Sequence, residues 1–207
     1  MGKGIVQQES LKVAGKRSRL WFHEDIVQVL SRNKGSENIE MIFLQFPFSE
    51  ETREVKWNGD GFEKMENLKI LIIKNGHFSR GPTHLPNSLR VLEWNGYPSQ
   101  YLPFDFCPES LAIFNLSHGQ FSSDALTDFS LKPGFTCVKV LRFDKCPNVT
   151  HIPDVSSLIN LEELSFRRCD NLSTIHESVW SLDNLKILDA EYCHKLRSFL
   201  SLMLPSL

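Results

Sequence analysis

The sequence predicts an α/β solenoid, in which short parallel strands form a ladder along one side of a stack of coils. Three segments of the 207-residue chain are written in nearly the same twelve letters: VKVLRFDKCPNV from Val138, LEELSFRRCDNL from Leu161 and LKILDAEYCHKL from Leu185. The apolar spacing Leu-x-x-Leu-x-Leu-x-x-Cys/Asn starts at six positions: Leu68, Leu89, Leu111, Val138, Leu161 and Leu185. These starts lie 21, 22, 27, 23 and 24 residues apart. This period is that of a leucine-rich repeat.

The chain before the repeats, residues 1–36, is expected to be a separate short segment. Within it, GKRSRLW predicts a turn or a hairpin, and HEDIVQVLSRNKG predicts a helix with Gly35 just past its end. The apolar side of this helix has four residues: Ile26, Val27, Val29 and Leu30. Three basic residues before the helix favour a solvated turn over a nuclear-import or nucleic-acid patch: Lys16, Arg17 and Arg19.

The strands are expected at the start of each repeat, where alternate side chains point inward and stack from coil to coil. A weaker seventh unit precedes the six and has Ile39, Ile42 and Leu44 as its anchors. The second anchors of the six units are Leu71, Leu92, Phe114, Leu141, Leu164 and Leu188. The third anchors are Ile73, Trp94, Leu116, Phe143, Phe166 and Ala190. A second set of apolar residues closes the back of the coil: Leu102 with Pro103, Ile152 with Pro153, and Ile175.

The ninth place of the last three repeats is always a cysteine. Cys146, Cys169 and Cys193 follow the strand where the backbone turns inward, so each side chain is expected to be buried. A cysteine in such a place is a small apolar residue with a weak donor for a loop carbonyl. Parallel side chains in register are poorly aimed for a disulfide. The five cysteines, an odd number without a CxxC pair, also disfavour a disulfide scaffold and a zinc knuckle.

Composition excludes several classes of function. A net charge of −2 gives no general attraction to nucleic acid or anionic membrane, and no apolar run reaches the roughly 20 residues that span a bilayer. The amino-terminal MGKGIVQQES lacks the apolar core of a secretory signal. We therefore expect an intracellular protein with free thiols.

No catalytic constellation is found in the sequence. The seven histidines show no metal-ligand spacing, and Gly15-Lys16 lacks the other residues of a phosphate-binding loop. Cys193 and His194 are neighbours, but the cysteine is expected to point inward. Ser117, His118 and Asp124 are close in sequence, yet no GxSxG elbow frames the serine. The sequence thus predicts a chain that is not an enzyme and holds no metal.

The surface best suited to a function is the exposed, concave face of the strand ladder, because concave solenoid faces commonly bind partners. Its early coils are apolar and its later coils are charged. The candidate partner-binding residues are Arg142, Asp144, Lys145, Glu163, Arg167, Arg168, Asp189, Glu191 and Tyr192. In register, Asp144, Arg167 and Glu191 form a row of alternating charge. This row either stabilises the sheet alone or forms a polar recognition patch, and the sequence does not decide between them.

Several segments resemble plant TIR-type nucleotide-binding leucine-rich-repeat disease-resistance proteins. The first group is MGKGIVQQES, GKRSRLWFHEDIVQVL and IEMIFL, and the second is FEKMENLKIL, LPNSLRVLEWNGYP and LEELSFRRCDNL. The resemblance covers essentially the whole chain, although Leu11 stands where the family usually has proline. It implies that residues 1–36 are the end of the winged-helix part of the nucleotide-binding region. Residues 37–207 then hold about six to seven leucine-rich repeats, the last one truncated.

The resemblance implies a non-enzymatic interaction module in plant defence. In the family, this segment sits against the nucleotide-binding region and helps to hold the receptor inactive, while later repeats contribute to recognition of pathogen effectors. The implied partner is a protein, either a pathogen effector or the receptor's own nucleotide-binding domain, and not nucleic acid or a membrane. The implied location is the cytoplasm or the nucleus. ADP or ATP and the NAD-cleaving activity would need domains upstream of Met1, so no cofactor is expected in this chain.

Two alternatives remain open. One is a substrate adaptor of a ubiquitin ligase, whose leucine-rich repeats also carry cysteine at the ninth place. It would need an F-box-like helical module before the repeats, for which 36 residues are too few. The other is a longer receptor with upstream ADP-binding and NAD-cleaving domains.

The carboxyl end suggests a repeat that is cut off. SFLSLMLPSL carries no charge after Arg197, and LPSL resembles the opening LPNSL at Leu85. An uncapped stacking face leaves apolar side chains in water. We therefore expect self-association through residues 196–207.

Overall fold

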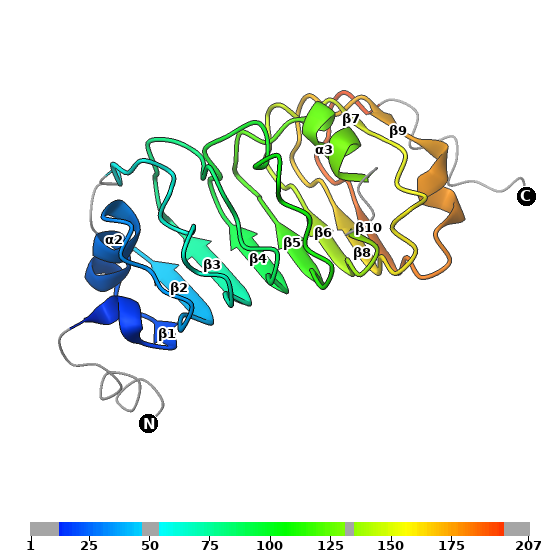
Figure 1. Ribbon diagram of the computed structural model, residues 1–207. Helices are drawn as coiled ribbons and strands as arrows, with labels where there is room; N and C mark the ends of the chain where they lie inside the picture. Colours follow the sequence, from blue (N-terminus) through cyan, green and yellow to red (C-terminus); the bar gives the residue numbers. More distant parts are fainter. Residues whose placement is uncertain (1–12, 47–53, 131–134, 197–207) are drawn as a thin grey trace, which may run out of the picture.

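The structure, a computed structural model of the chain, describes residues 13–46, 54–130 and 135–196. The chain winds into a stack of coils, and each strand of the stack joins one parallel sheet along the molecule (Figure 1). The sheet has eight strands in the order β1-β2-β3-β4-β5-β6-β8-β10. Their bounds are Arg19–Leu20, Met41–Gln45, Ile70–Lys74, Val91–Trp94, Ile113–Asn115, Val140–Arg142, Glu163–Ser165 and Ile187–Asp189. The predicted parallel ladder is confirmed.

The inward anchors fall where the repeat places them. Leu44, Ile73 and Trp94 are in register on β2, β3 and β4, and all three are fully buried. The weaker unit before the six repeats is therefore a true coil, since its anchors Ile39 and Ile42 are buried as well. Burial of one such side chain stabilises the fold by about 1.5–3 kcal/mol, so the repeated anchors supply most of the stacking energy. Ala190, the last third anchor, is only half-buried.

Residues 13–36 form the first layer of the solenoid and pair with the rest of the ladder. A 3-10 helix, η1 (Ala14–Lys16), leads into β1, and helix α2 (His23–Ser31) follows. Of the predicted turn or hairpin, the structure has the turn, at η1. A hairpin is not formed, because β1 runs parallel to β2 and pairs with it through Leu20 and Ile42. Gly15 packs closely against the backbone of Lys34, and a Cβ added at Gly15 would sit 1.9 Å from the Lys34 carbonyl oxygen. A winged-helix origin of residues 1–36 stays a prediction.

Helix α2 is confirmed with the predicted apolar side. Ile26, Val29 and Leu30 are buried, and Val27 packs against the core. The helix ends at Ser31, and Asn33, just past the C-cap residue Arg32, has the left-handed φ of 47°. The amide of Lys34 donates to the carbonyl of Val29 at 2.9 Å, and the amide of Asn33 donates to the carbonyl of Leu30 at 3.4 Å. This pattern is a Schellman cap.

The predicted solvated basic turn is corrected at Arg17. Its side chain is buried, and its Nη1 lies 2.6 Å from the Asp25 carboxylate of α2. Arg17 therefore joins the turn to the helix and does not contribute to a basic surface, whereas Lys16 and Arg19 are exposed.

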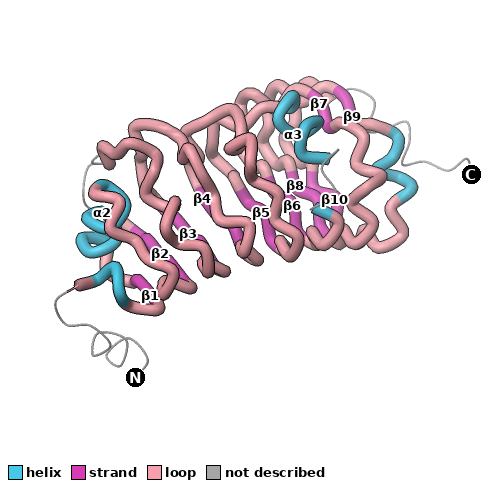
Figure 2. The backbone as a smooth tube through the Cα atoms, viewed as in Figure 1, coloured by secondary structure: helices cyan, strands magenta, loops and turns pink. Residues whose placement is uncertain are grey.

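The back of the coils carries little regular structure, as the tube in Figure 2 shows. Two short strands, β7 (His151–Ile152) and β9 (Thr174–Ile175), pair in parallel across the coil from the main ladder. Helix α3 (Ser123–Ser130) and the 3-10 helix η3 (Glu177–Ser181) complete this side. The buried Ile152 and Pro153 confirm the predicted back closure. None of the helices in the described ranges is long and apolar enough to cross a membrane.

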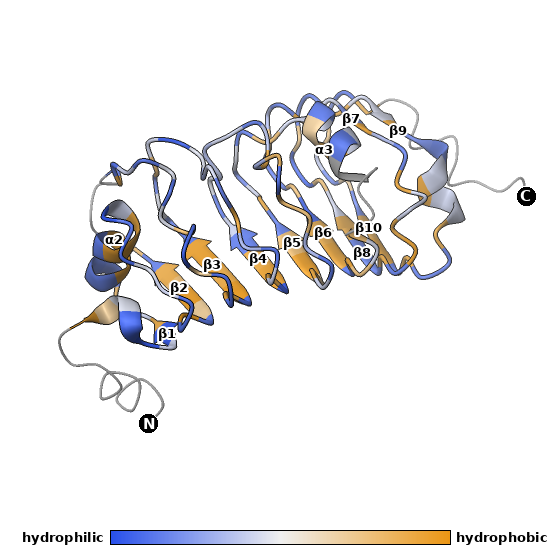
Figure 3. Cartoon of the chain, viewed as in Figure 1, coloured by the Kyte–Doolittle hydropathy of each residue, from blue (hydrophilic) through white to orange (hydrophobic). Residues whose placement is uncertain are grey.

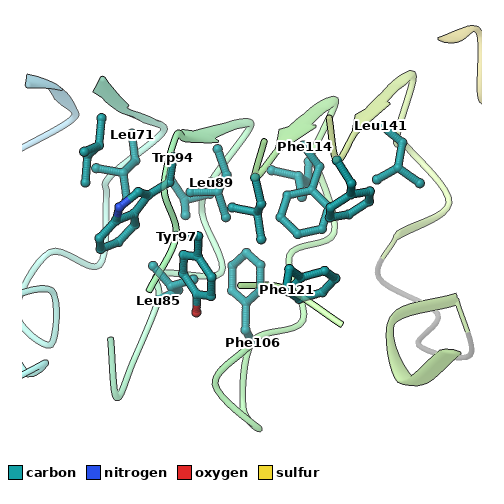
Figure 4. Close-up of a cluster of buried hydrophobic side chains, with 14 of the residues drawn as sticks. Leu71, Leu85, Leu89, Trp94, Tyr97, Phe106, Phe114, Phe121 and Leu141 are labelled. Atoms are coloured by element: carbon teal, nitrogen blue, oxygen red, sulfur yellow. The ribbon is translucent and has the colours of Figure 1, made fainter. Parts of the chain in front are cut away.

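An aromatic chain runs through the core and joins successive coils (Figure 4). Trp94 contacts the rings of Trp57, Phe62, Phe78 and Tyr97 at centroid distances between 5.0 and 6.1 Å. Farther along, Phe143 is stacked between two rings, with Phe121 at 5.0 Å and Phe166 at 5.8 Å. Such ring pairs add about 0.5–1.5 kcal/mol beyond their buried area. The coils are therefore coupled through side chains as well as through the sheet.

Candidate functional site

The ladder face that points away from the core changes character along the molecule. On the early strands it carries half-buried apolar side chains, and Figure 3 colours β2 and β3 largely hydrophobic. In register, one row of this face is Met41, Ile70, Val91, Ile113 and Val140. The next residue in that row is Glu163, where the charged half begins. The expected division into apolar early coils and charged later coils is therefore present.

Six of the nine predicted site residues form what we call the polar patch: Arg142, Asp144, Glu163, Arg167, Asp189 and Glu191. Two ion pairs between neighbouring coils hold it together. Nε of Arg142 lies 2.5 Å from Oε1 of Glu163, and Nη2 of Arg167 lies 2.9 Å from Oε2 of Glu191. The hydrogen bond from Arg142 to Glu163 raises the pKa of Arg142. These side chains are thus fixed in position on a surface that water can reach.

Asp144 does not pair with the side chain of Arg167 as the alternating row predicts. Its Oδ1 instead accepts the Ser165 hydroxyl at 2.6 Å and the backbone N–H of Arg167 at 2.9 Å. Ser165 is buried, with 4% of its surface exposed. The carboxylate therefore ties two coils together at the strand ends, and within this row the ion pair is that of Arg167 with Glu191. The predicted row is correct for one of its two contacts.

The other three predicted site residues share a backbone feature that the sequence reading missed. The eighth place of all six repeats has a left-handed φ between 55° and 77°: Asn75, Gly96, His118, Lys145, Arg168 and Tyr192. The strand ends there, and the chain turns toward the ninth place. A left-handed conformation costs an ordinary residue roughly 1–2 kcal/mol more than glycine. The signal was present in Asn75 and Gly96, residue types that tolerate this conformation.

Lys145, Arg168 and Tyr192 therefore leave the ladder face and line a hollow at its edge. We call this the flank hollow, with a volume of about 530 Å³ and seven lining residues: Lys145, Pro147, Arg168, Asp170, Asn171, Tyr192 and His194. The Tyr192 ring lies under two guanidinium groups, with the Arg167 Cζ at 5.6 Å and the Arg168 Cζ at 5.2 Å from its centroid. The predicted site is thus two adjoining surfaces.

The ninth-place cysteines lie just inside this edge and confirm the prediction made for them. Cys146, Cys169 and Cys193 are buried, and each thiol donates to a carbonyl at the strand end of the preceding coil. The acceptor distances are 3.5 Å to Leu116, 3.0 Å to Phe143 and 3.1 Å to Phe166. Burial raises the pKa of Cys146 and of Cys169 to about 12. These thiols are therefore poor nucleophiles.

The weak catalytic candidates are not assembled into a site. Cys193 is committed to the Phe166 carbonyl, while His194 lines the flank hollow. Ser117 is buried and its hydroxyl donates to Asn115 at 2.7 Å, while His118 is exposed. Within the described ranges, no group of three histidine, cysteine or acidic side chains could hold a metal ion.

Comparison with solved structures agrees with this fold. A leucine-rich-repeat protein of Leptospira interrogans superposes with a TM-score of 0.59 and 17% identity, over 84% of this chain and 40% of that chain. A scan of protein families finds no match to the sequence.

The sequence is similar to curated plant proteins over most of its length. It is 32% identical over 200 residues to the Arabidopsis thaliana protein Suppressor of npr1-1, Constitutive 1, covering 96% of this chain. It is 32% identical to the disease resistance protein RPP2A of the same plant over 98% of this chain, and 26% identical to the TMV resistance protein N of Nicotiana glutinosa over 96%. The chain spans 14% to 16% of the length of these relatives.

The repeat ladder and these relatives lead to the same family. The relatives at about 30% identity are TIR-type nucleotide-binding leucine-rich-repeat proteins, and the matching region folds here as a leucine-rich-repeat solenoid. This chain corresponds to a leucine-rich-repeat region of the TIR-type plant disease-resistance proteins.

Proposed function

We propose that the chain is a non-enzymatic module that binds a protein partner through the polar patch. The observation that carries this proposal is the presence of two ion pairs between neighbouring coils, Arg142 with Glu163 and Arg167 with Glu191, on three adjacent coils. Both pairs remain accessible to water, with arginine side chains 43% and 46% exposed. A stabilising role alone is a weak reason for them, because exposed ion pairs contribute only about 0.2–1 kcal/mol. Charges fixed in this way are well suited to select a partner of complementary charge.

Within a receptor of this family, the partner is the receptor's own nucleotide-binding region or a pathogen effector. The family resemblance supports both, and the relatives are named as a disease resistance protein and a TMV resistance protein. The absence of an assembled catalytic group in the described ranges supports a non-enzymatic role. A cytoplasmic location is part of the same proposal and is supported by the free thiols of the described cysteines.

The test measures binding to the nucleotide-binding region of a TIR-type relative by biolayer interferometry. Reversal of charge at the patch, with Arg142→Glu and Glu191→Lys, should weaken binding about tenfold, because like charges then meet across the interface. Two exposed residues outside the patch serve as matched controls, Arg90→Glu and Glu66→Lys. Equal effects of patch and control variants would show that the polar patch does not bind this partner.

A further inference from the structure

We propose that the flank hollow binds an acidic peptide segment of the partner protein, with Lys145 and Arg168 each meeting a carboxylate. This role rests on the proposed function for the partner being a protein. It adds the chemistry that the partner must present, and it uses residues outside the polar patch.

The first support is the unpaired charge of the hollow. Most neighbouring cations of the same coils already have a polar partner: Arg142 pairs with Glu163, Arg167 pairs with Glu191, Lys139 and Lys186 share Glu162, and Lys195 donates to the amide oxygen of Asn171. Lys145 and Arg168 have no carboxylate partner in the part of the chain that the structure describes. Both are exposed. The cations that line the hollow are therefore those left available for an anion from outside.

The second support is the fixed position of Arg168. Its guanidinium lies 5.2 Å from the centroid of the half-exposed Tyr192 ring. A cation held over an aromatic face keeps its N–H groups at the edge free to donate, and it loses less conformational freedom when a carboxylate binds. Arg167 also lies over this ring, but its guanidinium forms an ion pair with Glu191. Tyr192 thus acts as a platform that aims Arg168.

The third support is the backbone cost of these side chains. Lys145, Arg168 and Tyr192 all have left-handed φ values, of 55°, 59° and 62°. Glycine fills the same place in the repeat at Gly96. Long side chains in strained positions are a sign of function, because a cheaper residue was available for the fold. The strain also places the three side chains at one edge, since it turns the chain off the ladder.

The shape and charge of the hollow favour a peptide over a nucleic acid. Asp170 lines the hollow beside the two cations, so a continuous run of phosphates would meet a like charge. A peptide can instead place a backbone N–H against that carboxylate while its acidic side chains meet Lys145 and Arg168. A volume of about 530 Å³ accommodates a few side chains.

The probe is a fluorescein-labelled hexaglutamate peptide, followed by fluorescence polarisation with the full chain, and hexaglutamine is the neutral probe. Lys145→Gln and Arg168→Gln should each weaken hexaglutamate binding roughly three- to tenfold, the range expected for a partly exposed charge-assisted contact. Asp170→Asn should strengthen it, because a like charge leaves the hollow. Arg90→Gln, at an exposed arginine elsewhere on the solenoid, should leave it unchanged.

Arg168→Gly separates loss of binding from loss of folding. This variant removes the strain at residue 168, so it should bind hexaglutamate as weakly as Arg168→Gln while unfolding at the same or a higher temperature. Weakening by Arg90→Gln equal to that by Arg168→Gln would overturn the proposal, and so would weaker binding by Asp170→Asn. A hexauridylate RNA that binds more tightly than hexaglutamate, with the same response to the variants, would show that the occupant is nucleic acid.

The polar patch provides the control that keeps the two proposals apart. Arg142→Glu should leave hexaglutamate binding unchanged, although it weakens binding of the nucleotide-binding region. If hexaglutamate does not bind but the patch variants still weaken that protein interaction, the role of the flank hollow is wrong and the proposed function stands. If hexaglutamate binds as described but the patch variants do not weaken the protein interaction, the role of the flank hollow stands and the proposed role of the polar patch is wrong.

Discussion

Single residues of each repeat have distinct physical roles, and the eighth and ninth places show this most clearly. The eighth place turns the chain through a left-handed conformation, and the ninth place returns a small side chain to the core. The cysteine role could be predicted, because a cysteine kept among buried anchors behaves as an apolar residue. The left-handed turn was missed because lysine, arginine and tyrosine give no local sign of it. These are also the residues that line the flank hollow.

Gly96→Ala tests the conformational requirement without a steric clash. An added Cβ at Gly96 would meet its nearest atom, the carbonyl oxygen of Gly76, at an ordinary 3.7 Å. The variant should nevertheless lose about 1 kcal/mol of unfolding free energy, because φ is 77° and alanine disfavours that region. Urea unfolding followed by circular dichroism measures this. A stability equal to that of the parent chain would contradict the left-handed assignment.

The buried thiols predict a loss of stability in alkaline solution. Burial raises the pKa of Cys146 and Cys169 from 9.0 to about 12, so the unfolded chain releases these protons first. Their contribution to stability is complete below pH 9 and is lost between pH 9 and 12. Urea midpoints from pH 7 to pH 10.5 should fall less for Cys169→Ala than for the parent.

In the folded chain at pH 8, a maleimide should label the exposed Cys137 before the three buried cysteines.

At the scale of elements, the sequence predicts what repeats and misses what occurs once. The strands β2 to β6, β8 and β10 and the helix α2 follow from apolar periodicity, which a regular stack needs at every coil. Strand β1 has two residues, Arg19 and Leu20, and is ordered by its pairing with β2, so no local pattern marks it. The burial of Arg17 likewise depends on Asp25 in α2. The sequence predicted that the site lies on the exposed face of the ladder. It did not predict the flank hollow at the edge of that face, because the hollow depends on left-handed backbone φ values.

Glu162 bridges two lysines, one on the coil before its own and one on the coil after it. This arrangement predicts an acid-sensitive contact. Its carboxylate lies 2.9 Å from Nζ of Lys139 and 2.6 Å from Nζ of Lys186. These hydrogen bonds lower the pKa of Glu162 from 4.5 to about 2. The contribution of Glu162 to stability is therefore present above pH 4.5 and is lost as the pH falls toward 2.

Glu162→Gln should accordingly be less stable than the parent at pH 7. Its unfolding free energy should also fall less than that of the parent when the pH is lowered from 7 to 3. The effect should be small because the carboxylate is exposed and screened by solvent and salt. Glu66→Gln is the matched control, at an exposed glutamate with no ion pair among the described residues. If both variants show the same difference in urea midpoint between pH 7 and pH 3, the two lysines do not hold Glu162.

The whole molecule is a one-dimensional stack, so its cooperativity depends on the contacts between neighbouring coils. The sheet provides one continuous set of such contacts from β1 to β10. The aromatic chain provides another, and it passes from Trp94 through Tyr97 and Phe121 to Phe143 and Phe166. The polar patch and the flank hollow both lie on the coils that Phe143 and Phe166 support. A break in this chain should therefore uncouple the candidate site from the early coils.

Phe143→Ala tests this coupling. It removes a fully buried ring stacked on Phe121 and Phe166, and it should cost about 3–5 kcal/mol locally. Three tryptophans precede residue 143 and Trp180 follows it, so the difference between the intact chain and its Trp180→Phe version reports on the late coils alone. In the parent, the early and late signals should share one urea midpoint, because the core is continuous. In Phe143→Ala, the late signal should be lost at lower urea than the early one, because the later coils have lost their aromatic contact with the rest. A single shared midpoint in the variant would mean that the sheet alone couples the coils.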